Sequence, residues 1–237
     1  MTHRRGAAVL AILLAAAAAL SLLHKLAARP GPVIRAQSRP LEALPELAAA
    51  HLAARNFLGE PSVVVPVEHS GDWLRVLTPA RQRLPSHPAG TDSFGALAPA
   101  QTSAWLRADS LPSPPILTNR IIVSVSAQTL SIIGVGSRTW PVGVGAPGTP
   151  TPIVVTGYLE ARYRDAAQGQ AEHPVQLSSL HSTAADEPFG GNDGGLIRIH
   201  FQASASGAVS HGCIRVPIEA IAAVNALPLG TLITTEE

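Results

Sequence analysis

Apolar and polar residues alternate in several short segments between residues 118 and 237, a pattern typical of strands with one buried face. Turns rich in glycine, serine or asparagine separate these segments. The pattern predicts strands at 120–126, 129–135, 139–145, 153–164 (a pair), 196–201 and 230–236, and a short helix within 216–227. One short helix among many strands predicts a mainly β domain, of sandwich or barrel type, at 118–237.

The preceding region has a similar but shorter pattern. Segments 62–68, 71–79 and 104–111 are strand-like and are joined by turns and a loop rich in proline, serine and glycine. They predict a small SH3-like β module at 61–114, and the proline-rich stretch 111–118 marks its end. Nothing in the module carries chemistry, so it is interpreted as structural.

The first sixty residues have a different character. Arg4 and Arg5 precede an uncharged, apolar run at 7–23, which is typical of an export signal or a membrane helix. We therefore expect an N-terminal signal or membrane anchor at 1–28, cleaved or uncleaved, with a buried helix as the alternative. Residues 29–60 are expected to be a proline-containing linker followed by a short helix, since leucines form a helical stripe within 41–59.

Composition narrows the function classes. The net charge is +1 and only 14% of the residues are charged, so the chain has no basic stripe to follow a phosphate backbone and nucleic acid is not an expected partner. An export signal would place the remaining chain outside the cytoplasm. A single cysteine in such a chain forms no internal disulfide, and it is either an inert apolar residue or a reactive thiol.

That cysteine is Cys213, in the stretch "SHGCIRV" at 210–216. His181, His200 and His211 lie in the same third of the chain, which raises the alternative of a zinc site. The spacing does not fit zinc well, because there is no CxxC or HExxH and His211 and Cys213 share one short loop. We therefore do not expect a metal site.

A thiol nucleophile fits the same residues better. A nearby histidine can take the proton of a thiol or lower its pKa. The backbone N–H groups of Gly212 and Cys213 can point at one place, because glycine lets the chain turn tightly, and such donors stabilise an oxyanion. The loop can therefore hold both a nucleophile and an oxyanion hole.

"SHGCIRV", with "IRIH" upstream, resembles the signature of the L,D-transpeptidases of bacterial cell walls, the YkuD-type catalytic domain. The "QTLSIIGVGSRTWPVGVGAPGTPTP" and "FGGNDGGLIRIH" stretches are similar to other parts of that family, and the resemblance covers about 118–237. By resemblance, Cys213 is the nucleophile, His200 the base, and His211 a catalytic-loop residue that supports the loop. Ser210 and Arg215 match positions that shape the loop and the substrate-binding end. The earlier module is similar, more weakly, to one found before the catalytic domain in some actinobacterial cell-wall enzymes.

The resemblance implies an enzyme that cross-links peptidoglycan stem peptides through a thioester on the cysteine, with no metal or organic cofactor. Carbapenems, which acylate the family's cysteine, are the implied inhibitors. Two departures bear on this: Phe201-Gln202 stand where relatives have small residues, and only nine residues separate His200 from Ser210. An L,D-carboxypeptidase of the same fold and a catalytically weakened cell-wall binding protein are therefore kept as alternatives. The "LIRIHF" alternation predicts that Phe201 faces away from His200.

Overall fold

A computed structural model describes residues 33–34, 50–86, 98–111, 116–186, 192 and 194–237. The predicted N-terminal signal or anchor and most of the linker lie outside these residues. Among the described residues, no helix has the length and apolar character needed to cross a membrane.

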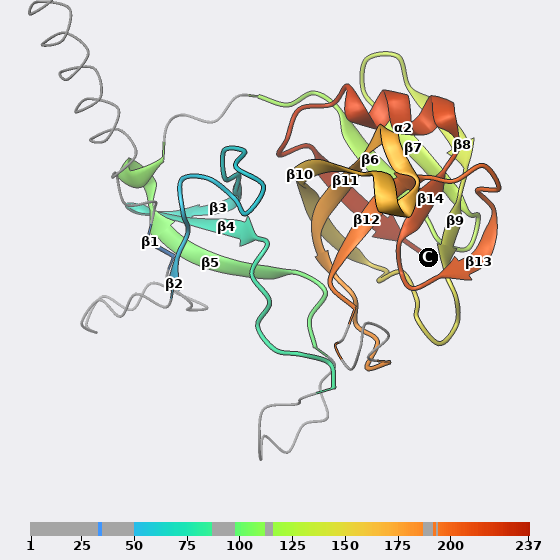
Figure 1. Ribbon diagram of the computed structural model, residues 1–237. Helices are drawn as coiled ribbons and strands as arrows, with labels where there is room; N and C mark the ends of the chain where they lie inside the picture. The colour runs from blue at the N-terminus through green and yellow to red at the C-terminus, as the bar shows by residue number, and fades with distance from the viewer. Residues whose placement is uncertain (1–32, 35–49, 87–97, 112–115, 187–191, 193) are drawn as a thin grey trace, which may run out of the picture.

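A ten-stranded sheet dominates the structure (Figure 1). Its order is β13-β9-β14-β12-β11-β10-β15-β6-β7-β8, with parallel pairs β13–β9, β14–β12 and β15–β6. The strands are β6 (Arg120–Ser124), β7 (Thr129–Ile133), β8 (Arg138–Pro141), β9 (Gly143–Gly145), β10 (Val155–Asp165), β11 (Gln170–His181), β12 (Leu196–Phe201), β13 (Gly207–Ser210), β14 (Ile214–Val216) and β15 (Leu232–Glu236).

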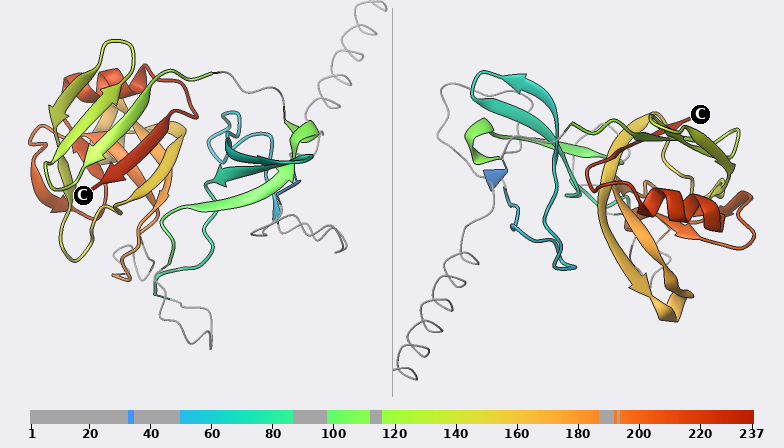
Figure 2. Two further views of the ribbon diagram at one scale, coloured as in Figure 1. Left: turned by 180° about the vertical axis from the view of Figure 1, so that it is seen from behind. Right: turned by 90° about the horizontal axis from the view of Figure 1, so that it is seen from above.

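The sheet curls until its two ends approach each other. Gln128, in the turn before β7, accepts a hydrogen bond at its carbonyl oxygen from Val142 N and at its side chain from Gly207 N of β13. The one α-helix among the described residues of this domain, α2 (Ile218–Asn225), packs against β11 and β12. Figure 2 shows α2 lying across the curled sheet, with the long β10–β11 hairpin extending beyond it. The predicted mainly β fold with one short helix is confirmed.

The core of this domain consists of the inward-facing side chains of the curled sheet and α2. Alternate residues of β12, Ile197 and Ile199, are buried in it, as are Ile214 and Val216 of β14. Burial of such side chains contributes about 1.5–3 kcal/mol each. The period-two pattern of the sequence therefore selects which face of β12 and β14 is buried.

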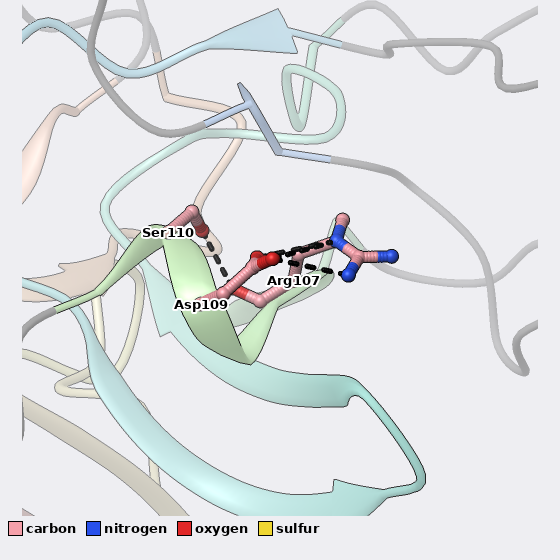
Figure 3. A network of polar contacts seen from close by, with 3 residues as sticks. All are labelled: Arg107, Asp109 and Ser110. Carbon is pink, nitrogen blue, oxygen red and sulfur yellow. Dashed lines mark hydrogen bonds and ion pairs between the residues drawn. The ribbon is translucent and has the colours of Figure 1, made fainter.

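The smaller sheet is a three-stranded antiparallel meander in the order β3-β4-β5. Its strands are β3 (Val65–Ser70), β4 (Trp73–Thr78) and β5 (Thr102–Arg107), followed by the 3-10 turn η1 (Ala108–Ser110). At this turn, shown in Figure 3, Arg107 pairs with Asp109 at 3.0 Å and Ser110 Oγ donates to Arg107 O. The hydrogen bond from Arg107 lowers the pKa of Asp109. The three predicted strands are present, and the SH3-like assignment and the domain boundaries stay predictions.

The helix predicted within 41–59 is wrong over the described residues 50–59. Ala50–His51 form the short strand β2, which pairs with β1 (Val33–Ile34). Farther along, Asn56 Oδ1 accepts hydrogen bonds from Leu58 N and Glu60 N. Asparagine side chains offer the backbone this turn as an alternative to a helix, so the leucine pattern was not sufficient.

Hydrogen bonds join the smaller sheet and its flanking segments to the large domain. Tyr158 OH donates to Val63 O at 2.8 Å, and Ser179 Oγ donates to Gln101 Oε1 at 2.6 Å. Arg81 donates to the carbonyl oxygens of Ser182 and Gly194, which flank the connection between β11 and β12. The segments around the small sheet therefore help to fix the end of β11.

Candidate active site

The loop that carries Cys213 connects β13 to β14, next to β12. Strands β12 and β14 are parallel, and His200 is registered with Arg215. Cys213 immediately precedes β14 and is half-buried. Because successive side chains of a strand point to opposite faces, Cys213 and Arg215 lie on the same face as Arg198 and His200, opposite the core face of Ile199 and Ile214.

Hydrogen bonds to carbonyl oxygens hold this loop in place. Ser210 Oγ donates to Cys213 O at 2.6 Å, and Ser210 O accepts from Ala146 N and Thr149 Oγ1 at 2.8 and 2.9 Å. Thr151 Oγ1 donates to Gly212 O at 2.8 Å and accepts from Gly145 N at 2.9 Å. None of the hydrogen bonds described for the loop uses the N–H of Gly212 or Cys213. Their role as an oxyanion hole stays a prediction.

Gly212 is required at its position for two reasons. Its φ is +92°, a left-handed conformation that costs other residues roughly 1–2 kcal/mol. A Cβ atom there would also lie 2.9 Å from Ile197 Cδ1 and 3.3 Å from Pro150 O. A larger residue would therefore strain the backbone and displace the loop next to the thiol.

His200 has the tautomer that a general base needs. Its Nδ1 lies 3.1 Å from Phe201 O, and since a carbonyl oxygen only accepts, Nδ1 carries the proton. Nε2 is then unprotonated in the neutral ring and can accept a proton. Burial lowers the pKa of His200, and the positive charges of Arg215 and Arg198 lower it further, against the opposing effect of the Phe201 hydrogen bond. The ring is therefore neutral at pH 7.

Phe201 lies on the other side of β12 from His200. It packs against the hydrophobic core, and its ring contacts His173 edge-on at a centroid distance of 5.0 Å. The orientation predicted from the alternation of "LIRIHF" is confirmed. Phe201 therefore does not occupy the face that carries His200.

The other predicted residues have distinct surroundings. His211 is exposed, and its Nε2 lies 3.7 Å from Asp186 Oδ2, so the described bonds that hold the loop come from serine and threonine rather than from this ring. Ser210 is only 3% exposed, so its contribution is to shape the loop. His181 is buried and bonded to Pro79 O, and burial lowers its pKa. These contacts place His181 at the junction with the smaller module.

The sequence did not indicate Thr149, Thr151 or Arg198 as site residues. The signal for the threonines is the "GTPTP" run, at the end of the stretch that is similar to the family. Arg198 Nη1 donates to Tyr163 OH at 3.0 Å and to Gln168 Oε1 at 3.2 Å, contacts that depend on the β10–β11 hairpin. None of these partners is near in sequence, so the pattern of β12 alone could not reveal them.

Two further observations concern the described part of the chain. It contains no group of three or more His, Cys, Asp or Glu side chains placed to hold a metal ion. A cavity of about 540 Å³ lies between Val63–Pro66, Leu117–Arg120 and Leu229–Gly230, and it is lined by none of the predicted site residues.

Comparison with known proteins identifies the larger domain. The family model of the L,D-transpeptidase catalytic domain, YkuD, matches residues 118–234. No curated protein matches the chain in sequence.

Solved structures give more distant matches. L,D-transpeptidase 1 from Mycobacterium tuberculosis is 18% identical, with 57% of this chain and 78% of that chain covered and a TM-score of 0.35. L,D-transpeptidase 3 from the same organism, in complex with a faropenem-derived adduct, is 15% identical, with 74% and 94% covered and a TM-score of 0.40. An L,D-transpeptidase from Mycobacterium smegmatis is also 15% identical, with 74% and 100% covered and a TM-score of 0.38. Similarity at this level assigns no residue roles to this chain.

Proposed function

We propose that this chain, whose residues 118–234 belong to the YkuD family of L,D-transpeptidase catalytic domains, cross-links peptidoglycan stem peptides through a thioester on Cys213. One observation supports the proposal most: a half-buried thiol at a loop whose carbonyl oxygens are tied back, on the same strand face as a histidine with an unprotonated Nε2. These are the parts that acyl transfer through a cysteine requires.

In the first half-reaction, His200 Nε2 takes the thiol proton, and Sγ attacks the carbonyl carbon of the diamino acid at position three of a stem. The N–H groups of Gly212 and Cys213 donate to the oxyanion that forms. The C–N bond then breaks, His200 returns the proton to the leaving D-alanine amine, and a thioester remains. Burial and the nearby arginines favour this proton return, because they destabilise the protonated form of His200.

In the second half-reaction, an amine of another stem attacks the thioester. His200 takes a proton from the attacking nitrogen, the C–S bond breaks, and the sulfur recovers the proton. If water attacks instead, the product is a shortened stem and the enzyme is an L,D-carboxypeptidase. The third alternative, a weakened binding protein, was motivated by Phe201 and by the short segment between His200 and Ser210. The packing of Phe201 against the core, away from His200, removes the first of these two reasons.

The test is incubation of the full chain, in mild detergent, with tetrapeptide stems and analysis of products by mass spectrometry. We expect cross-linked dimers, release of D-alanine and a covalent protein adduct, all absent in Cys213→Ala. Shortened stems without dimers would indicate the carboxypeptidase, and no turnover with an unreactive thiol would indicate the binding protein. We also propose that carbapenems acylate Cys213, which the same variant tests.

We further propose that the chain acts outside the cytoplasm, held by or released from the segment at 1–28. The basis is the sequence of that segment, with Arg4 and Arg5 before an apolar run. Since Cys213 is the only cysteine, a membrane-impermeant maleimide should label the chain in intact cells. Labelling only after lysis would contradict this localisation.

A further inference from the structure

Two arginines flank His200 on the face that carries Cys213. Arg198 precedes His200 by two residues on β12, and Arg215 is its registered partner on β14. Neighbouring strands lie about 4.8 Å apart, so extending this register places the backbone of Arg198 next to that of Cys213, while its guanidinium contacts the β10–β11 hairpin on the other side of β12. Both positive charges affect the titration of His200, which is consistent with their proximity to the ring.

Neither arginine has an acidic partner among the described residues. The ion pairs there are Arg75–Glu68, Arg107–Asp109 and His211–Asp186. Arg198 is held by two neutral groups, Tyr163 OH and Gln168 Oε1, which orient its guanidinium without cancelling its charge.

The side chain of Arg215 lies close to Gly143 of the neighbouring strand β9. Its Nε is buried without a hydrogen-bond partner, and it is registered with Gly143, where an added Cβ would lie 3.3 Å from Arg215 Cβ. A glycine at this place lets the arginine lie against β9. The face therefore carries two positioned cations and no described counter-charge.

We propose that Arg198 and Arg215 form a binding site for a substrate carboxylate beside Cys213 and His200. A planar guanidinium matches a carboxylate with two parallel hydrogen bonds, and a pair of them without an internal acid favours an anionic ligand. The inference rests on the proposed function for the identity of the ligand. The expected ligand is a carboxylate group within about one residue of the scissile bond, belonging to either the leaving D-alanine or the diamino acid.

The first test does not need a substrate. Iodoacetate and iodoacetamide alkylate the same sulfur, but only iodoacetate carries a carboxylate, and Cys213 is the only cysteine in the full chain. Removing a nearby unit charge should lower the iodoacetate-to-iodoacetamide rate ratio about three- to tenfold at low salt, and less at 1 M salt. We therefore expect Arg198→Gln and Arg215→Gln to lower the ratio, while Arg198→Lys retains most of it.

The iodoacetamide rate of each variant is the internal control, because a merely structural disturbance of the loop changes both rates. The charge-matched control is Arg120→Gln, an exposed residue of β6, which is separated from β12 by β11, β10 and β15 in the sheet. We expect this variant to have the same iodoacetate-to-iodoacetamide rate ratio as the unmodified chain. A ratio that is also unchanged in both Arg198→Gln and Arg215→Gln overturns the carboxylate site.

The second test identifies the carboxylate. Three stems are compared: one unmodified, one with a D-alanine amide, and one with the diamino-acid carboxylate amidated. The amide that removes the bound carboxylate should raise KM in the unmodified enzyme and have little further effect in Arg198→Gln. Equal effects of both amides in enzyme and variant overturn the site as a substrate contact. If no stem is turned over at all, the proposed function fails, whereas the alkylation ratios still decide whether a carboxylate site exists.

Discussion

Replacing Thr151 by valine tests how the catalytic loop is held. Thr151 is 1% exposed, and its hydroxyl donates to Gly212 O and accepts from Gly145 N. Valine has nearly the same shape, so the packing is retained while both hydrogen bonds are lost. Gly145 and Gly212 are themselves buried, and an unpaired buried backbone group costs about 1–3 kcal/mol. The free energy of unfolding should therefore fall by about 2–6 kcal/mol.

Thr151→Ser is the matched control, since it keeps the hydroxyl and removes one methyl group, at a cost of about 1 kcal/mol. Urea unfolding of the full chain, followed by circular dichroism, measures the stability of each variant. The iodoacetamide rate of Cys213 reports the loop separately, and we expect it to change in Thr151→Val because Gly212 directly precedes the cysteine. If Thr151→Val is as stable as Thr151→Ser and alkylates at the same rate, the hydroxyl does not hold the loop.

Three further changes test other parts of the structure. Burial raises the pKa of Glu160 to about 7, so the folded chain binds the proton of this carboxyl more tightly than the unfolded chain does. Proton binding by Glu160 therefore adds to the free energy of unfolding at pH 4, and this addition is lost as the pH rises from about 4 to 7. Glu160→Gln should therefore remove that pH dependence and raise stability at pH 8 by up to about 3 kcal/mol; an equal effect at pH 4 and pH 8 in urea unfolding would contradict this. Phe201→Ala should lower the free energy of unfolding by about 3 kcal/mol, because the ring packs against the core, and faster turnover of stems at unchanged stability would instead make it a gate. His200→Ala should lower turnover roughly 10²–10⁴-fold and His181→Ala far less per folded molecule, so equal losses would count against His200 as the base.

Local sequence patterns predicted much of this protein's architecture. The alternation at 196–201 predicted β12 with its correct bounds, and the predicted helix within 216–227 and last strand correspond to α2 and β15. "SHGCIRV" located the candidate nucleophile and the glycine that its loop requires. These features are readable because strand period, glycine conformation and thiol chemistry depend on adjacent residues.

Other strands were not predicted correctly, because their bounds depend on which strands they pair with in the sheet. The strand expected at 139–145 is two, since the chain changes partners from β7 to β13 and β14 between β8 and β9. The pair expected within 153–164 is the single strand β10. Its partner β11 was missed because it contains Pro174 and buried polar residues such as Gln176 and Ser178. Their side chains are satisfied by Asn225 and Ile197 O, which only the folded chain brings near.

The strand-rich fold, the thiol loop and the histidines that could serve it were all predictable from the order of the residues. Which of these groups share a face, and what holds them there, depends on how the chain folds. The Thr151–Gly212 bond spans 61 positions, and Arg198 meets Tyr163 across 35. Contacts of this kind form only when parallel and long-range strand pairs close, and their register is set by burial of the whole sheet rather than by any short stretch of residues.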